Sequence, residues 1–94
     1  MHVVGFEVEI RIPAAQSLKD RRQVVRSLLD GAQQRFHVSV AEIGGQDTWQ
    51  RATLGFAVVA SEARLAGHIV DEIERFLWAR PEIEVVDATT HWLG

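Results

Sequence analysis

Residues 17–26 read Ser-Leu-Lys-Asp-Arg-Arg-Gln-Val-Val-Arg and place four positive side chains at the predicted start of a helix. A helix N-terminus carries partial positive charge and favours acids nearby, yet Asp20 is the only acid in this stretch. Lys19, Arg22 and Arg26 are predicted to share one exposed face, where they would bind a phosphate beside free backbone N–H groups. The alternative is an ordinary solvated face, whose i,i+4 repulsion costs roughly a few tenths of a kcal/mol.

Arg21 differs from its three cationic neighbours because its position on the helical wheel matches the buried residues Leu28 and Ala32. We therefore expect its side chain to curl around the helix end and to pair with a carboxylate of a neighbouring sheet. That role would be structural. The candidate anion-binding residues are consequently the three outward cations alone.

A second group of polar and aromatic residues is the run Gln46-Asp47-Thr48-Trp49-Gln50-Arg51-Ala52. It lies at a predicted hairpin, where binding residues often collect, so Trp49 and Arg51 would assist the helix if the hairpin lies on the same side. The alternative is a hairpin end with Trp49 lying over the edge of the core. Trp78 on the polar face of the second predicted helix and Trp92 near the end of the sequence suggest a protein interface.

Catalytic patterns are weak in this sequence. Glu7 and Glu9 share one face of a predicted strand about 7 Å apart, which suits paired-carboxylate chemistry, but ion pairs with Arg11 or Arg51 explain them better. The four histidines fall on different elements, and there is no cysteine, G-x-S-x-G motif or glycine-rich phosphate loop. We therefore expect no enzyme activity, catalytic residue, metal or cofactor.

Hydrophobic periodicity predicts the elements that position these residues. Period-2 alternation predicts strands over 3–12, about 36–43, about 50–60 and about 83–92, with a bulge or change of face near Ala41. Helical spacing predicts one helix from Leu18, with Ser17 and Asp20 as a capping box, and a second helix capped by Ser61. The second helix has a predicted buried stripe of Leu65, Ala66, Ile69, Val70, Ile73, Phe76 and Leu77.

The order β-α-β-β-α-β predicts one α+β domain spanning residues 1–94. Two right-handed crossovers around a central hairpin give a ferredoxin-like sandwich, a four-stranded antiparallel sheet with both helices on one face.

RNA-recognition motifs share this architecture and stack bases on aromatic residues of the two central strands. The corresponding outward positions here carry no ring: Gly5, Glu7, Glu9, Thr53, Gly55 and Ala57. Small residues there favour a partner chain that packs closely.

The formal net charge of −3 conceals an asymmetry, because residues 11–35 carry +4 and the remainder −7. Such a chain binds an anion locally but repels polyanions elsewhere, so we expect no DNA binding.

The sequence starts without a basic n-region, and its longest apolar run is the seven residues 54–60, against about 20 for a membrane helix. We expect a cytoplasmic protein with no membrane association.

Three stretches together resemble the bacterial YlxP-like family, catalogued as a domain of unknown function: Ser17–Arg22, Val38–Glu42 and Gln46–Gly55. The similarity runs across nearly the whole chain, although Gly44-Gly45 and His91-Trp92 are less typical. The resemblance implies a ferredoxin-like fold, a bacterial cytoplasmic setting and a dimer. The family's genes often lie beside genes for translation initiation and ribosome maturation, which points toward ribosomal RNA; the resemblance supplies no catalytic residues.

Two functional hypotheses follow. The first is a non-enzymatic accessory protein that contacts ribosomal or other structured RNA through Lys19, Arg22 and Arg26, with Trp49 and Arg51 assisting. The second is a protein-interaction or small-molecule-sensing module that dimerises through the open face of the sheet.

Overall fold

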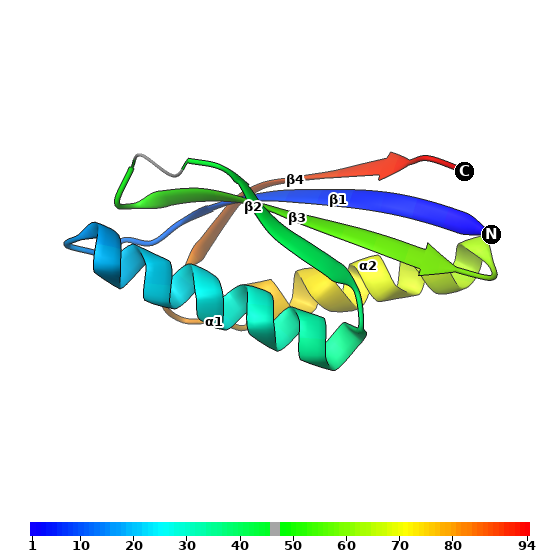
Figure 1. The fold of residues 1–94 in the computed structure, drawn as a ribbon, viewed down its shortest axis with the longest axis horizontal. Helices are drawn as coiled ribbons and strands as arrows, with labels where there is room; N and C mark the ends of the chain where they lie inside the picture. Colours follow the sequence, from blue (N-terminus) through cyan, green and yellow to red (C-terminus); the bar gives the residue numbers. More distant parts are fainter. Residues whose placement is uncertain (46–47) are drawn as a thin grey trace.

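The computed structural model describes residues 1–45 and 48–94, and Gln46 and Asp47 of the predicted hairpin group lie outside the described residues. Its elements are β1 (His2–Arg11), α1 (Leu18–Phe36), β2 (Ser39–Gly44), β3 (Arg51–Ala60), α2 (Ala63–Trp78) and β4 (Glu84–Trp92). The strands pair in the order β2-β3-β1-β4, all antiparallel, and both helices cover the same face (Figure 1). The predicted ferredoxin-like fold is confirmed.

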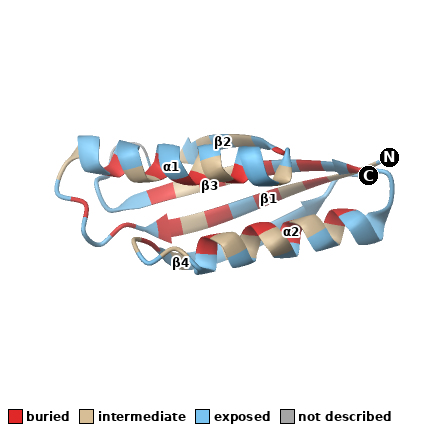
Figure 2. Cartoon of the chain, turned by 90° about the horizontal axis from the view of Figure 1, so that it is seen from below, coloured by how far each residue is buried: buried red, intermediate tan, exposed pale blue. Residues whose placement is uncertain are grey.

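The core lies between the sheet and the helices, where the alternating residues of the two central strands meet the apolar faces of α1 and α2. All nine predicted inward residues of β1 and β3 are buried, as is the following Ile12, and Figure 2 shows this alternation along both strands. Phe6 and Phe56 lie opposite each other in register, with ring centroids 6.2 Å apart. Burying an apolar side chain of this size stabilises the fold by about 1.5–3 kcal/mol.

The first turn of α1 is capped as predicted. Ser17 is the N-cap, and its hydroxyl accepts the backbone N–H of Asp20 at 3.1 Å. The Asp20 carboxylate accepts the N–H of Gln16 at 3.1 Å, so the return bond of the capping box reaches one residue further back than usual. The cap fixes the start of α1 at Leu18.

The prediction that a strand begins at residue 36 was wrong, because α1 continues through Phe36 and β2 begins at Ser39. His37 ends the helix in the left-handed region, with φ at 54°, and its N–H donates to the Gln33 carbonyl at 2.9 Å. The reason is a tertiary contact: the Phe36 ring packs edge-on against Phe76 of α2, with centroids 5.8 Å apart. An apolar residue at a helix end therefore resembled the first inward residue of a strand.

Two predictions about α2 were also wrong. The N-cap is Glu62 and not Ser61, and the Glu62 side chain makes no capping hydrogen bond. The chain turns through both residues after β3 before the first helical residue. Leu65 is 45% exposed because it lies about 100° around the helix from the buried Ala66, outside the stripe that meets the sheet.

The bulge predicted in the second strand is confirmed. The β2–β3 register shifts between Glu42 and Gly44, which leaves Ile43 as the extra residue, 46% exposed on the open face of the sheet. A side chain at Gly55 would meet Ile43 at 3.1 Å, so this glycine makes room for the bulged residue. The bulge leaves Glu42 facing α1.

Candidate functional site

Arg21 connects the start of α1 to the β2–β3 hairpin. Its side chain is 2% exposed, its Nε donates to the Arg51 carbonyl at 2.9 Å, and its Nη2 donates to the Gly45 carbonyl at 2.7 Å. The same Nη2 forms an ion pair with the carboxylate of Glu42. The predicted inward, structural role of Arg21 is therefore confirmed, and Glu42 is the carboxylate that receives it.

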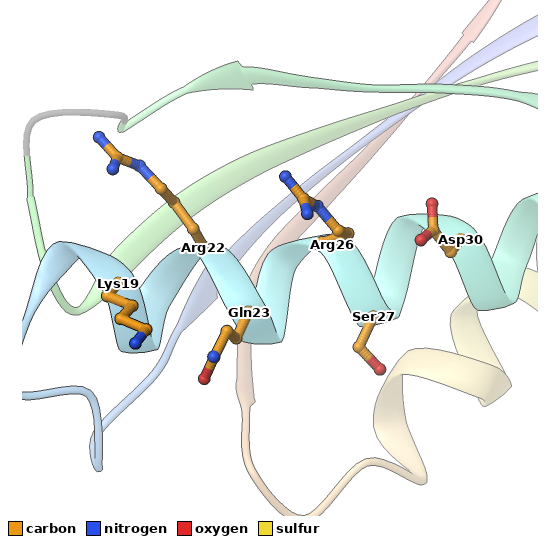
Figure 3. A pocket seen from close by; sticks show the side chains of 6 residues that line it. All are labelled: Lys19, Arg22, Gln23, Arg26, Ser27 and Asp30. Carbon is orange, nitrogen blue, oxygen red and sulfur yellow. The ribbon is translucent and has the colours of Figure 1, made fainter.

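The three outward cations of α1 are all exposed, and they line one shallow depression together with Gln23, Ser27 and Asp30. Figure 3 divides them into two rows: Arg22 and Arg26 point toward β2, whereas Lys19 lies on the opposite flank. Among the described residues, no carboxylate lies within 4.0 Å of these three cations. As far as the described residues show, the charge of these three side chains is therefore available to an external anion.

Arg22 and Arg26 also border a groove between α1 and β2, with a volume of about 280 Å³. Its apolar lining consists of Val25, which is 4% exposed, with the partly buried Leu29 and Val40. The acidic residues that line it are Asp30 and Glu42, and Glu42 is already paired with Arg21. The groove therefore combines an apolar lining with two cations at one end, a feature that the sequence pattern of α1 alone did not indicate.

The backbone of the helix start contributes less than the sequence suggested. The N–H of Asp20 is bonded to Ser17, and the N–H of Arg21 donates to the Ser17 carbonyl at 3.2 Å. The Asp20 carboxylate also adds negative charge at this end. These bonds occupy two of the N–H groups at the helix start, so the cationic side chains are the main positive charge that this end presents.

The hairpin lies beside the start of α1, but it does not bring Arg51 to the cationic face. Gln50 donates to the carbonyls of Pro13 and Ala15 at 3.1 and 3.4 Å, which ties the hairpin to the loop before the helix. The Arg51 side chain lies on the opposite, open face of the sheet, where it pairs with Glu9 at 2.8 Å. Trp49 is 54% exposed in the segment between the strands.

The glutamates of β1 on the open face of the sheet are bonded to side chains of the neighbouring strands. The predicted pairing of Glu9 with Arg51 is confirmed, whereas Glu7 pairs with His91 of β4 at 3.0 Å, a partner that the sequence did not reveal. Glu7 and His91 are 84 residues apart and meet because β4 lies beside β1. In the described ranges, no three histidine, aspartate or glutamate side chains come close enough to hold a metal ion.

The other tryptophans are exposed, Trp78 by 63% and Trp92 by 53%, at the end of α2 and the end of β4. Neither tryptophan lies on α1, the helix that carries the cationic face.

Within the described residues, neither helix is long and apolar enough to cross a membrane.

The sheet order and the two helices define the class of this protein as a ferredoxin-like α+β sandwich. A de novo designed protein with ferredoxin fold has a TM-score of 0.54 and 18% identity, covering 100% of this chain and 87% of the designed protein. A REP-associated tyrosine transposase bound to a REP hairpin has a TM-score of 0.48 and 9% identity, and the match covers 99% of this chain and 56% of the transposase chain. This similarity is too low to inform function.

The chain belongs to the family described as protein of unknown function DUF503, whose sequence model matches residues 3–90. It is 40% identical over 91 residues to the uncharacterized protein YlxP of Bacillus subtilis (strain 168), covering 96% of this chain and 99% of that protein. The family expected from the helix-start and hairpin motifs is confirmed. Its description names no activity, so function has to be argued from the surface.

Proposed function

We propose that this protein is a non-enzymatic accessory protein that binds structured RNA, with ribosomal RNA as the leading partner, through the cationic face of α1. The observation that carries the proposal is the set of three exposed cations on one helix, Lys19, Arg22 and Arg26, with no ion-pair partner among the described residues. Phosphate suits arginine because the planar guanidinium donates two parallel hydrogen bonds to its oxygens.

The balance of charge favours a local contact. The rest of the chain is acidic, so a polyanion is attracted to α1 and repelled elsewhere, which favours one bounded contact over general coating of nucleic acid. Arg51 is paired with Glu9 on the far face of the sheet, so the leading contact uses the helix and leaves the hairpin cation aside. Trp49 stays in the proposal as an exposed aromatic residue near the helix start.

The test is the salt dependence of RNA binding by the double variant Arg22→Glu/Arg26→Glu. Each phosphate contact contributes about 0.7–0.9 to the magnitude of the slope of log K against log salt, so loss of two contacts should reduce that magnitude by about 1.4–1.8. The matched control is Arg64→Glu/Arg75→Glu on the exposed face of α2, which changes the net charge equally. Binding to ribosomal RNA that ignores both salt and the α1 substitutions would refute the proposal.

A second candidate function is a dimeric module that uses the open face of the sheet, and the exposed apolar residues at one end of this face favour it. Val59 is 62% exposed and lies opposite Val3, and Leu93, 71% exposed, donates its N–H to the Val3 carbonyl at 2.8 Å. Sedimentation of the wild type and of Val59→Glu at high concentration tests it. A wild type that stays monomeric would exclude this candidate.

A further inference from the structure

We infer that the RNA bound by this protein is an unpaired strand lying in the groove between α1 and β2, with Arg22 and Arg26 on its phosphates. This inference rests on the proposed function and names the class of RNA. A strand in this groove differs physically from a duplex on the outer surface of α1, because the duplex keeps the faces of its bases stacked inside and presents phosphates, 2′-hydroxyls and base edges.

The direction of the two arginines supports the groove. In Figure 3 both point toward β2 and away from the flank that carries Lys19, and both line the 280 Å³ space between α1 and β2. That volume is near the lower end of the ~300–1,000 Å³ of small-ligand pockets. It suits about one nucleotide with its flanking phosphates, and a double helix is too wide to enter it.

The lining of the groove suits bases. The partly buried Leu29 and Val40 offer an apolar surface to the faces of unpaired bases, and the arginine planes offer a stacking surface. β2 is an edge strand, and among the described residues no strand pairs with its outer side. Its outward backbone groups can therefore donate to and accept from base edges.

The open face of the sheet offers no such surface. The outward positions of its two central strands carry no aromatic ring on which a base can stack, and Glu7 and Glu9 there are already bonded to His91 and Arg51. A base in contact with this protein is thus better accommodated beside α1 than on the sheet.

Asp30 limits the length of the strand in the groove. It lies one helical turn beyond Arg26, points to the same side in Figure 3, and has no cationic partner within 4.0 Å among the described residues. Its carboxylate repels a third phosphate, so the contact spans about two phosphates and then leaves the groove. Removing this charge should tighten binding.

The experiment measures fluorescence anisotropy with labelled oligouridine and with an RNA duplex of equal length. We expect the unpaired strand to bind at least ten-fold more tightly than the duplex. Val40→Trp, which fills the groove without changing charge, should weaken the unpaired strand about ten-fold and leave the duplex unchanged. The matched control Val59→Trp adds the same ring to the open face and should change neither.

Asp30→Asn provides a second measurement that does not depend on the fold tolerating a tryptophan, since Asp30 is exposed. It should tighten oligouridine binding about three-fold. Equal binding of strand and duplex, with no effect of either substitution, would overturn the groove and leave the proposed RNA contact standing. Absence of any RNA binding would refute the proposed function itself. Displacement of oligouridine by an oligoglutamate peptide of equal charge, at equal concentration, would overturn the inference in favour of a peptide groove.

Discussion

Replacing Arg21 with methionine should destabilise this protein more than any other exchange of a charged residue in the described chain. Methionine fills a similar space, so the loss is electrostatic and not a cavity. The substitution removes the bonds to the Arg51 and Gly45 carbonyls and leaves the Glu42 carboxylate without its partner. Hydrogen bonds to charged groups contribute about 1.5–3 kcal/mol each, which sets an upper bound of roughly 5–9 kcal/mol.

The expected loss is smaller than this bound because Glu42 is 20% exposed and water reaches it once Arg21 is gone. Breaking a buried ion pair by removing one partner costs about 3–5 kcal/mol, and we expect a value in that range. For a domain of this size that lowers the Tm by roughly 12 °C or more. The measurement is urea unfolding followed by circular dichroism, with thermal unfolding as a second probe.

Two companion variants make the result interpretable. Arg22→Met alters the adjacent but exposed cation and should change the free energy of unfolding by no more than about 0.5 kcal/mol. Arg21→Met/Glu42→Leu removes the orphaned charge and should recover about 1–2 kcal/mol of the single-variant loss. A loss below about 1 kcal/mol in Arg21→Met, or no recovery in the double variant, would refute the argument that this ion pair holds the hairpin to α1.

The remaining predictions concern the helices. Ser17→Ala removes the acceptor for the Asp20 N–H and should lower the free energy of unfolding by about 1 kcal/mol, whereas Ser17→Asp should retain the cap. Gly31→Ala should not give the gain of about 1 kcal/mol expected from helix propensity, because the new Cβ would lie 3.0 Å from the Phe76 ring. The double variant Gly31→Ala/Phe76→Leu should recover part of that gain. Denaturant unfolding measures the free energy of unfolding of each variant, and stabilisation by Gly31→Ala alone would contradict the packing argument.

The fold was predictable because its signals are local and agree with one another. Alternation in β1 and β3, the helical stripes and the Ser17 cap all point to the same arrangement. Two of the errors fall where a distant contact decides, whereas the errors in α2 are local, at its N-cap and at Leu65. Phe36 belongs to α1 because Phe76 receives its ring, and Glu7 pairs with His91 because β4 lies beside β1. No pattern along the chain contains either contact.

Gly31 illustrates the same limit in another form. In the sequence it is a weakness inside a helix, worth about 1 kcal/mol against alanine. In the structure it is the point where the Phe76 ring approaches α1, and that ring also lies against Phe36 and beneath the guanidinium of Arg80, 5.2 Å from its centroid. The ring has little freedom to move aside, so the glycine contributes to the packing of the two helices.

The candidate site was predictable only in part, and the reason lies in two adjacent arginines. Arg21 and Arg22 are residues of the same type and adjacent in sequence, but Arg21 is buried and forms an ion pair with Glu42, the only carboxylate of β2. That pairing neutralises the acid that would otherwise oppose Arg22 and Arg26 in the groove. The structural arginine therefore sets the electrostatics of the proposed site. If this coupling holds, Arg21→Met should weaken RNA binding even where the protein stays folded, because Glu42 regains an uncompensated charge beside the groove.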